Sequence, residues 1–186
     1  MKYLISGLGN IGAEYELTRH NIGFLVLDRL AEKYKAEFTT ARYGDTAMFK
    51  YKGRAIHLLK PATYMNLSGK AVNYWLETLK LDKEHLLVVV DDIALPFSSL
   101  RMRAKGSDAG HNGMKSIEQL TGGNNYPRLR FGLGNDFDAG QQVDYVLSRF
   151  TDEEFKQLPA AMDKAVEMIL SFTSIGINRT MNQFNS

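Results

Sequence analysis

The stretch HLLVVVDD, residues 85–92, constrains the fold of this chain most strongly. It is a continuous apolar run that two aspartates close. Such a run is typical of a strand buried on both faces, as in a parallel sheet covered by helices. In α/β proteins the carboxyl end of such a strand is where ligands bind and chemistry takes place. We therefore expect a buried central strand with Asp91 and Asp92 at a functional edge of the sheet.

Strands and helices mix along the rest of the chain. Alternating or short apolar runs predict strands, and apolar residues at helical spacing predict helices. The predicted strands cover residues 2–6, 45–51, 54–60, 85–92, 99–105 and 128–134. The predicted helices cover residues 22–35, 66–81, a short segment from about 113, 141–148 and 152–172. Asn21 is expected at the N-cap of the first helix, and Asn66 or Ser68 at that of the second. The last dozen residues are expected to be loosely ordered.

The chain length of 186 residues fits one domain, and 44% hydrophobic residues is an ordinary globular fraction. Neither a linker nor an internal repeat divides the sequence. We therefore expect a single α/β domain, residues 1–186, in which helices flank a mixed sheet.

The composition also limits the chemistry. The chain has no cysteine, which excludes disulfides, cysteine-bound zinc and a thiol nucleophile. The apolar segment before Gly7 is too short for a signal-peptide core or a membrane span, so we expect a cytoplasmic protein without a membrane partner. A net charge of +2 does not by itself indicate a nucleic-acid-binding protein.

A Gly-x-Gly-x-x-Gly pattern follows the first predicted strand, at Gly7, Gly9 and Gly12. In a dinucleotide-binding unit this turn opens a helix directly, and an acidic residue ends the next strand. Here the segment AEYELTRHN separates the turn from the helix, and Asp28 and Glu32 lie inside that helix. The context therefore disfavours a nicotinamide or flavin enzyme.

The polar residues indicate another kind of site. The chain has two His-Asn pairs, at residues 20–21 and 111–112, and Asn10 and Asn66 lie at predicted loop-to-helix junctions. Side-chain amides suit an amide or carbonyl ligand, and a histidine with an aspartate can activate water. The sequence contains neither a Gly-x-Ser-x-Gly elbow nor the His-x-x-His spacing of zinc sites.

Each of these residues also has a purely structural interpretation. Asn10 and Asn66 are common types in turns and helix caps, and Asp91 and Asp92 could simply end a strand and cap a turn. His111 could be a loop histidine that backbone groups satisfy. Arginines alternate along the last two predicted strands and could form a solvated face; they are Arg101, Arg103, Arg128 and Arg130.

Five separated motifs decide between these interpretations. They are YLISGLGNIGAEYELTRHNIGF, LLKPATYMNLSGKAV, VVVDDIALP, LRMRAKGSDAGHNGMKSI and YPRLRFGLGN. In this order they resemble the bacterial peptidyl-tRNA hydrolase family over most of the chain. The resemblance implies a single α/β domain with a twisted mixed sheet, no cofactor and no metal. The implied reaction is hydrolysis of the ester between a peptide, or an N-blocked aminoacyl group, and the 3′ end of tRNA.

The resemblance also implies roles for individual residues. His20 would be the general base, Asp91 its partner, and Asn10 a further catalytic residue. Substrate contacts would come from Tyr15, Met65, Asn66 and Asn112, and a tRNA phosphate would bind Arg103 and Arg130. The implied partner is peptidyl-tRNA, through its acceptor stem, its 3′ end and the peptide backbone, and the implied state is a monomer. Outward arginines on neighbouring strands would give a local basic patch suited to phosphates.

The sequence departs from the family pattern in loops. Ile11 replaces a usual proline, Ala94 replaces a common acidic residue, and LPFSSLR replaces a glycine-containing turn. These changes remove none of the implied catalytic groups. A noncatalytic RNA-binding relative is the second hypothesis, although the chain keeps both His20 and Asp91. His111 is the next candidate for the base.

Overall fold

The fold is built on one mixed sheet of seven strands, in the order β2-β3-β4-β1-β5-β7-β6. The structure, a computed structural model, describes residues 1–185. The strands are β1 (Lys2–Gly7), β2 (Thr39–Ala41), β3 (Gly44–Tyr51), β4 (Arg54–Pro61), β5 (Leu86–Asp92), β6 (Leu100–Arg103) and β7 (Arg128–Gly132). The central pairs β4-β1, β1-β5 and β5-β7 are parallel, and the outer pairs are antiparallel.

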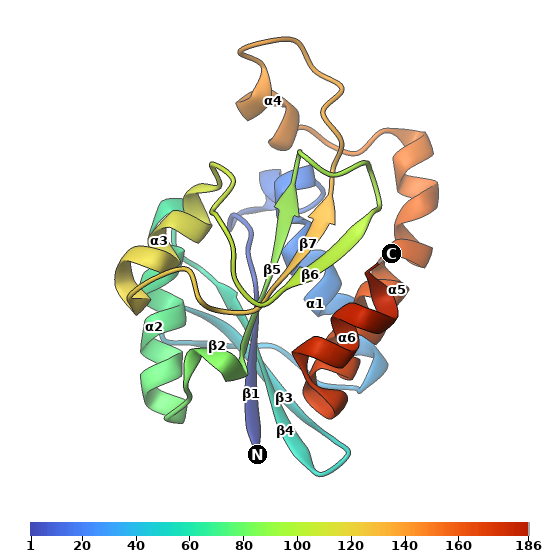
Figure 1. The fold of residues 1–186 in the computed structure, drawn as a ribbon. Coiled ribbons are helices and arrows are strands. Elements are labelled where there is room, and N and C mark those ends of the chain that lie inside the picture. The colour runs from blue at the N-terminus through green and yellow to red at the C-terminus, as the bar shows by residue number, and fades with distance from the viewer. Residues whose placement is uncertain (186) are drawn as a thin grey trace.

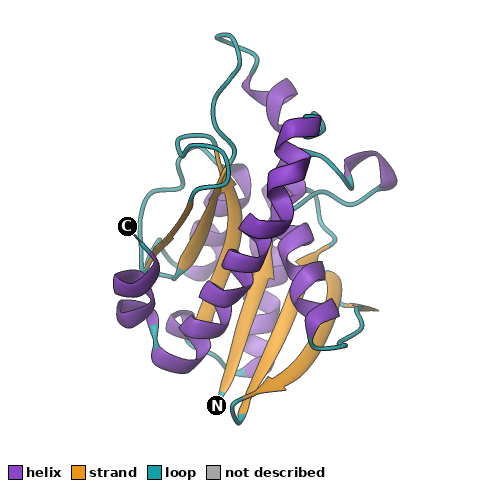
Figure 2. Ribbon diagram, turned by 90° about the vertical axis from the view of Figure 1, so that its right-hand side faces the viewer, coloured by secondary structure: helices purple, strands orange, loops and turns teal. Residues whose placement is uncertain are grey.

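Helices cover both faces of the sheet, which gives three layers (Figures 1 and 2). The helices are α1 (Ile22–Lys33), α2 (Ser68–Leu79), α3 (Asn112–Thr121), α4 (Gln142–Val146), α5 (Asp152–Ile175) and α6 (Ile177–Phe184). One core lies under α1, α5 and α6, and a second lies under α2 and α3. Every residue of β5 is buried between them. The predicted single α/β domain with a mixed sheet is therefore confirmed.

The glycine pattern after β1 is explained by close packing of backbones. A side chain at Gly7 would collide with the carbonyl group of Gly23, and one at Gly23 would come within 2.6 Å of the carbonyl oxygen of Val89. Only hydrogen fits at these two positions, so the start of α1 can lie directly on β1 and β5. This contact brings the segment before α1 over the carboxyl ends of the central strands.

The structure corrects the expectation for the last dozen residues. Those that it describes form the end of α5, the helix α6 and Asn185, while Ser186 lies outside the described residues. Ile177, Met181 and Phe184 recur at helical spacing and pack on the core. The side chain of Asn185 then holds edge strand β6, since it accepts from Met102 N–H at 3.0 Å and donates to Met102 O at 2.7 Å.

Several boundaries and caps also differ from the expectations. A 3-10 turn, Met65–Leu67, precedes α2, so Leu67 occupies the N-cap and neither Asn66 nor Ser68 caps the helix. Asn21 does occupy the N-cap of α1, but its side chain does not cap the helix. The short edge strand β2 was not predicted, and α5 runs three residues beyond the predicted end at residue 172. Within residues 1–185, no helix is both long and apolar enough to cross a membrane.

Candidate active site

His20 and Asp91 form the centre of the site, at the carboxyl end of β5. His20 lies in a 3-10 turn, Arg19–Asn21, just before α1. Its Nδ1 lies 2.8 Å from Oδ2 of Asp91, a hydrogen-bond distance. The predicted pairing of these two residues is therefore present. Within residues 1–185 the other ring nitrogen of His20, Nε2, makes no hydrogen bond.

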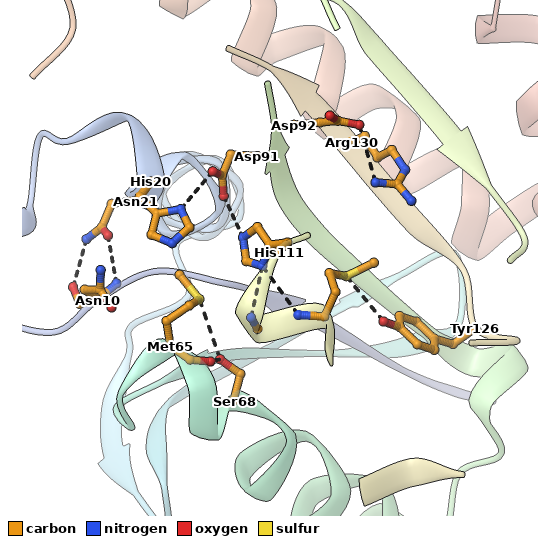
Figure 3. Close-up of polar contacts among 12 residues, drawn as sticks. Asn10, His20, Asn21, Met65, Ser68, Asp91, Asp92, His111, Tyr126 and Arg130 are labelled. Atoms are coloured by element: carbon orange, nitrogen blue, oxygen red, sulfur yellow. Dashed lines mark hydrogen bonds and ion pairs between the residues drawn. The ribbon is translucent and has the colours of Figure 1, made fainter. Parts of the chain in front are cut away.

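His111 approaches Asp91 from the opposite side (Figure 3). Its Nε2 lies 2.9 Å from Oδ1 of Asp91. Its Nδ1 accepts from the backbone N–H groups of Gly113, at 3.1 Å, and Met114, at 3.4 Å, and so caps the N-terminus of α3. An Nδ1 that accepts carries no proton, so this network assigns the proton to Nε2, which donates to Asp91. The structural interpretation of His111 holds for one ring nitrogen only, because the other binds the aspartate.

The two ionisable groups of the pair shift in opposite directions. Burial acts to lower the pKa of His20, but the charge of Asp91 and the hydrogen bond to it outweigh burial and raise that pKa above the ordinary 6.5. Burial acts to raise the pKa of Asp91, but the charges of His20 and His111 and their hydrogen bonds hold it well below its usual range. Asp91 is therefore ionised at neutral pH, and it favours the protonated form of His20.

Asn21 fixes the loop that carries Asn10 beside His20. Its Oδ1 accepts from the backbone N–H of Asn10 at 2.7 Å, and its Nδ2 donates to the carbonyl oxygen of Asn10 at 2.9 Å. Asn21 thus binds Asn10 as a neighbouring strand would. The side-chain amide of Asn10 makes no hydrogen bond within residues 1–185, so it remains available to a ligand.

Arg19 anchors the other side of the same turn. It is only 5% exposed, and its guanidinium binds Oε1 of Glu154 at 2.8 Å, the hydroxyl of Ser148 and the carbonyl oxygen of Tyr145. The guanidinium also lies 4.2 Å from the centre of the Tyr145 ring. Arg19 therefore joins the turn that carries His20 to Tyr145 in α4, to Ser148 just after it and to the start of α5.

A cleft of about 230 Å³ lies over these groups. Its polar wall comprises Asn10, His20, Asp91, Asp92, His111, Asn112 and Gln142. Its apolar wall comprises Ile93 and three residues of the α4 segment, Val143, Val146 and Leu147. The cleft therefore pairs hydrogen-bonding groups with a surface that suits an uncharged part of a ligand.

Three of the predicted substrate residues lie outside this cleft. Met65 is buried, with its sulfur next to Gly113. Asn66 is exposed in the 3-10 turn before α2, and Tyr15 is half-buried in another 3-10 turn, Ala13–Tyr15. Asn10 and Asn112 therefore line the cleft with His20, whereas Asn66 and Tyr15 are not among its lining residues.

The arginines on β6 and β7 do not form one solvated face. Arg128 is fully buried, because the segment after β6 folds over it. It donates to the carbonyl oxygens of Tyr126, Gly106, Ser107 and Asn124. Arg130 is held by Asp92 at 3.3 Å and by the carbonyl oxygen of Ser107 at 2.6 Å. Arg103 is exposed, so the expectation of an outward row of arginines is wrong for Arg128.

His20, Asp91 and His111 are also residue types that bind metal ions, and their ligand atoms lie within 4.8 Å of one another. Each histidine nitrogen that faces Asp91 lies at a hydrogen-bond distance from a different carboxylate oxygen. A metal ion would have to separate these pairs. The donor set is therefore one of mutual hydrogen bonds rather than an open coordination shell.

Comparisons with known proteins show the family of this chain. The model of a family described as peptidyl-tRNA hydrolase matches residues 4–186. The chain belongs to the peptidyl-tRNA hydrolase family. The peptidyl-tRNA hydrolase of Bacteroides fragilis is 56% identical over 185 residues, with 100% of this chain and 99% of that protein covered. That of Porphyromonas gingivalis is also 56% identical, with 100% of both chains covered.

A solved structure shows that the fold is shared as well. The peptidyl-tRNA hydrolase of Acinetobacter baumannii matches with a TM-score of 0.93 at 31% identity, covering 99% of this chain and 94% of that one. This member of the peptidyl-tRNA hydrolase family is therefore an enzyme of the hydrolase class.

Sequence reasoning missed part of the site of this hydrolase. It gave no role to the α4 segment, although Val143, Val146 and Leu147 have helical spacing and only weak burial. It also missed Arg19 and Asn21, which position the turn around His20. The signal for Asn21 was that it is the asparagine of the first of two similar His-Asn pairs. Of the two asparagines, however, only Asn112 lines the cleft.

Proposed function

We propose that this enzyme hydrolyses the ester that joins a peptide, or an N-blocked aminoacyl group, to the 3′ end of tRNA, with His20 as the general base. The observation that carries the proposal is the difference between the two histidines at Asp91. Both nitrogens of His111 are engaged, whereas His20 has Nδ1 on Asp91 and Nε2 without a protein partner in the described chain. Only His20 has a lone pair available to a water molecule in the cleft.

The reaction follows from this arrangement. Nε2 of His20 takes a proton from water, and the resulting hydroxide attacks the ester carbonyl carbon. Asp91 keeps the proton of the neutral imidazole on Nδ1 and stabilises the imidazolium that forms. When the tetrahedral intermediate collapses, the imidazolium returns the proton to the departing ribose oxygen. The products are a peptide carboxylic acid and a tRNA with a free terminal hydroxyl.

Asparagine side chains supply uncharged donors for the oxyanion and the peptide. The amides of Asn10 and Asn112 line the cleft and are free of protein hydrogen bonds within residues 1–185. Asn21 holds the backbone of Asn10 by two hydrogen bonds, and this fixes the position of Asn10. A donor fixed in advance near a developing oxyanion is typically worth about 3 kcal/mol of transition-state stabilisation. Because amides recognise the peptide backbone, such a site would accept many peptide sequences.

We assign the tRNA phosphate to the β6-β7 side of the cleft. Arg103 is exposed there without an ion-pair partner among the described residues, and Arg130 is fixed by Asp92, which itself lines the cleft. Phosphate contacts provide affinity that does not depend on base sequence. We further propose that the enzyme acts as a monomer in the cytoplasm, where tRNA serves translation.

The test is release of an N-acetylated amino acid from tRNA by the wild-type enzyme and by His20→Ala. We expect turnover by the wild type and a loss of about 10²–10⁴-fold in kcat/KM for His20→Ala, which is the typical contribution of general-base catalysis. His111→Asn is the matched variant, because asparagine retains a capping acceptor for α3. A full loss with His111→Asn and none with His20→Ala would move the base to His111.

A further inference from the structure

A cationic and aromatic cluster lies at the β2-β3 end of the sheet. It consists of Arg42, Tyr43, Lys70 and Tyr74, which we call the Arg42 surface. The Arg42 guanidinium lies 4.9 Å from the centre of the Tyr43 ring and 6.0 Å from that of Tyr74. The two tyrosine rings meet edge to face at 5.5 Å. Arg42, Tyr43 and Lys70 are exposed.

The charges of the Arg42 surface are not neutralised by the protein. Within residues 1–185, neither Arg42 nor Lys70 forms an ion pair, although other surface cations such as Arg29 and Lys60 do. Arg42 lowers the pKa of Tyr43, and the charge of Lys70 lowers it further, so both cations act on the same ring. The cluster thus presents two free positive charges on an aromatic base.

The surface is also held in place. The indole N–H of Trp75 donates to the carbonyl oxygen of Arg42 at 2.8 Å, which ties the β2-β3 turn to α2. Tyr43 has a φ of 63°, in the left-handed region that a tyrosine rarely adopts. Glycine or asparagine would suit this backbone better. A bulky side chain at a strained position indicates that the side chain itself has a use.

The Arg42 surface and the cleft lie at the same edge of the sheet, because Gly44, which follows Tyr43, pairs with Pro61 at the carboxyl end of β4, and β4 is parallel to β1 and β5. Lys70 and Tyr74 lie one turn apart on α2, just after Asn66. In the strand order, β1 and β5 lie between β7 and β6 on one side and β4, β3 and β2 on the other. Figure 3 shows Arg130 and Met65 on opposite sides of the group His20, Asp91 and His111.

We propose that the Arg42 surface binds the peptide part of the substrate beyond its first residues and favours acidic side chains. The proposal rests on the proposed function. The ester joins RNA to peptide, so the two parts leave the scissile bond in different directions. If phosphate binds at β6-β7, the peptide leaves past Asn66 towards Lys70 and Arg42. Two free cations there complement carboxylates, and the tyrosine rings provide area for the peptide chain.

The experiment compares kcat/KM for substrates that differ only in the peptide. All carry the same tRNA; one has a single N-acetylated amino acid, and two others add a short run of glutamates or a matched run of glutamines. The variant is the double charge reversal Arg42→Glu, Lys70→Glu. The control is Lys164→Glu, which reverses an exposed charge on α5, on the other face of the sheet. Salt and pH are held constant.

We expect the double variant to lose about tenfold in kcat/KM on the glutamate substrate relative to the glutamine substrate. Tenfold corresponds to about 1.4 kcal/mol, which two exposed charge pairs can supply. The single-residue substrate should be cleaved at the wild-type rate, and Lys164→Glu should alter no ratio. Tyr43→Asn should weaken cleavage of both longer substrates without lowering Tm, because asparagine tolerates the positive φ.

Each other outcome overturns the proposal. An equal loss on all three substrates would mean that the surface binds RNA, since they share only the tRNA and the first residue. Unchanged ratios would mean that it has no role in binding the peptide. Absence of wild-type turnover on the single-residue substrate would instead reject the proposed function, and the peptide surface with it.

Discussion

Asp91 binds two histidines that differ in the surroundings of their other ring nitrogen. Each carboxylate oxygen accepts from one ring, at 2.8 Å from His20 and 2.9 Å from His111. The rings differ in what their remaining nitrogen meets, which is backbone N–H for His111 and the open cleft for His20. A histidine whose two nitrogens are both occupied orients its partners, whereas one with a free nitrogen can move a proton.

The shifted pKa of His20 predicts the pH dependence of kcat/KM. A general base must be neutral, so activity falls as pH drops through the pKa of His20. Because Asp91 raises that pKa, the acidic limb should lie above pH 6.5. Asp91→Asn removes the charge that raises the pKa of His20, while burial still lowers that pKa. The acidic limb of kcat/KM should therefore move below pH 6.5, and the plateau rate should fall.

The measurement is a pH profile of kcat/KM for wild type, Asp91→Asn and the control His57→Gln. His57 is half-buried on β4, away from the cleft, and its substitution should leave the limb in place. A limb at the same pH in wild type and Asp91→Asn would show that Asp91 does not set the pKa of the base.

Strands β6 and β7 carry four arginines on one face of the sheet, but these arginines differ in burial and in function. Arg101 pairs with Arg130 across the two strands, and Arg103 with Arg128. The segment after β6 covers Arg128 but leaves Arg103 exposed. Exposed Arg103 can bind phosphate, and buried Arg128 holds the carbonyl groups of the loop that crosses it.

Substitutions on these strands should therefore separate binding from stability. Arg103→Ala should raise KM for tRNA substrates several-fold and reduce the slope of log KM against log salt by about 0.9, the loss of one phosphate contact. Its free energy of unfolding should stay within about 0.5 kcal/mol of wild type. Arg128→Ala should instead cost about 3 kcal/mol, because buried carbonyl groups lose their donors.

Enzyme kinetics over a salt series and urea unfolding of both variants provide the measurement. Lys50→Ala, an exposed position on β3, is the control and should change neither quantity. If Arg128→Ala shifted the salt slope and left stability intact, the two assignments would have to be exchanged.

The turn that carries His20 is held to α5 by a buried ion pair between Arg19 and Glu154. Arg19→Met keeps a long apolar side chain but removes the charge, so Glu154 loses its partner. We expect a cost of about 3 kcal/mol in the free energy of unfolding, typical for breaking one side of a buried pair. Backbone amides of the α4 segment should exchange with deuterium faster than in wild type.

Arg29→Met is the matched variant for that experiment. Arg29 pairs with Asp163 at the surface, where its side chain is 36% exposed. Such pairs contribute about 0.5 kcal/mol. Similar losses for both variants would show that Arg19 does not anchor the turn.

At the scale of the whole molecule, the sequence predicted the fold where local pattern decides it. The apolar run of β5 identified the central strand, and its two aspartates marked the functional edge. The roles of His20 and Asn10 came from the family resemblance. The bond between His111 and Asp91 was not predicted, because no local pattern shows which distant groups meet.

The predictions for Arg128 and α6 failed for one physical reason. Burial of a residue depends on which distant segments pack over it. The alternation in β7 gave the face of Arg128 correctly, yet the covering loop comes from residues about twenty positions earlier. The helix α6 was missed because Asn178, Arg179 and Asn182 separate its few apolar residues. Packing against β6 supplies the stability that its own composition lacks.

Asn185 has a consequence for how copies of this protein behave towards one another. An edge strand with free N–H and C=O groups is a template on which a second chain can add a strand. At β6 the amide of Asn185 occupies both groups of Met102, and at the other end of the sheet β2 is only three residues long. The side chain of Asn185 thus blocks the addition of a strand from a second chain at Met102 of β6.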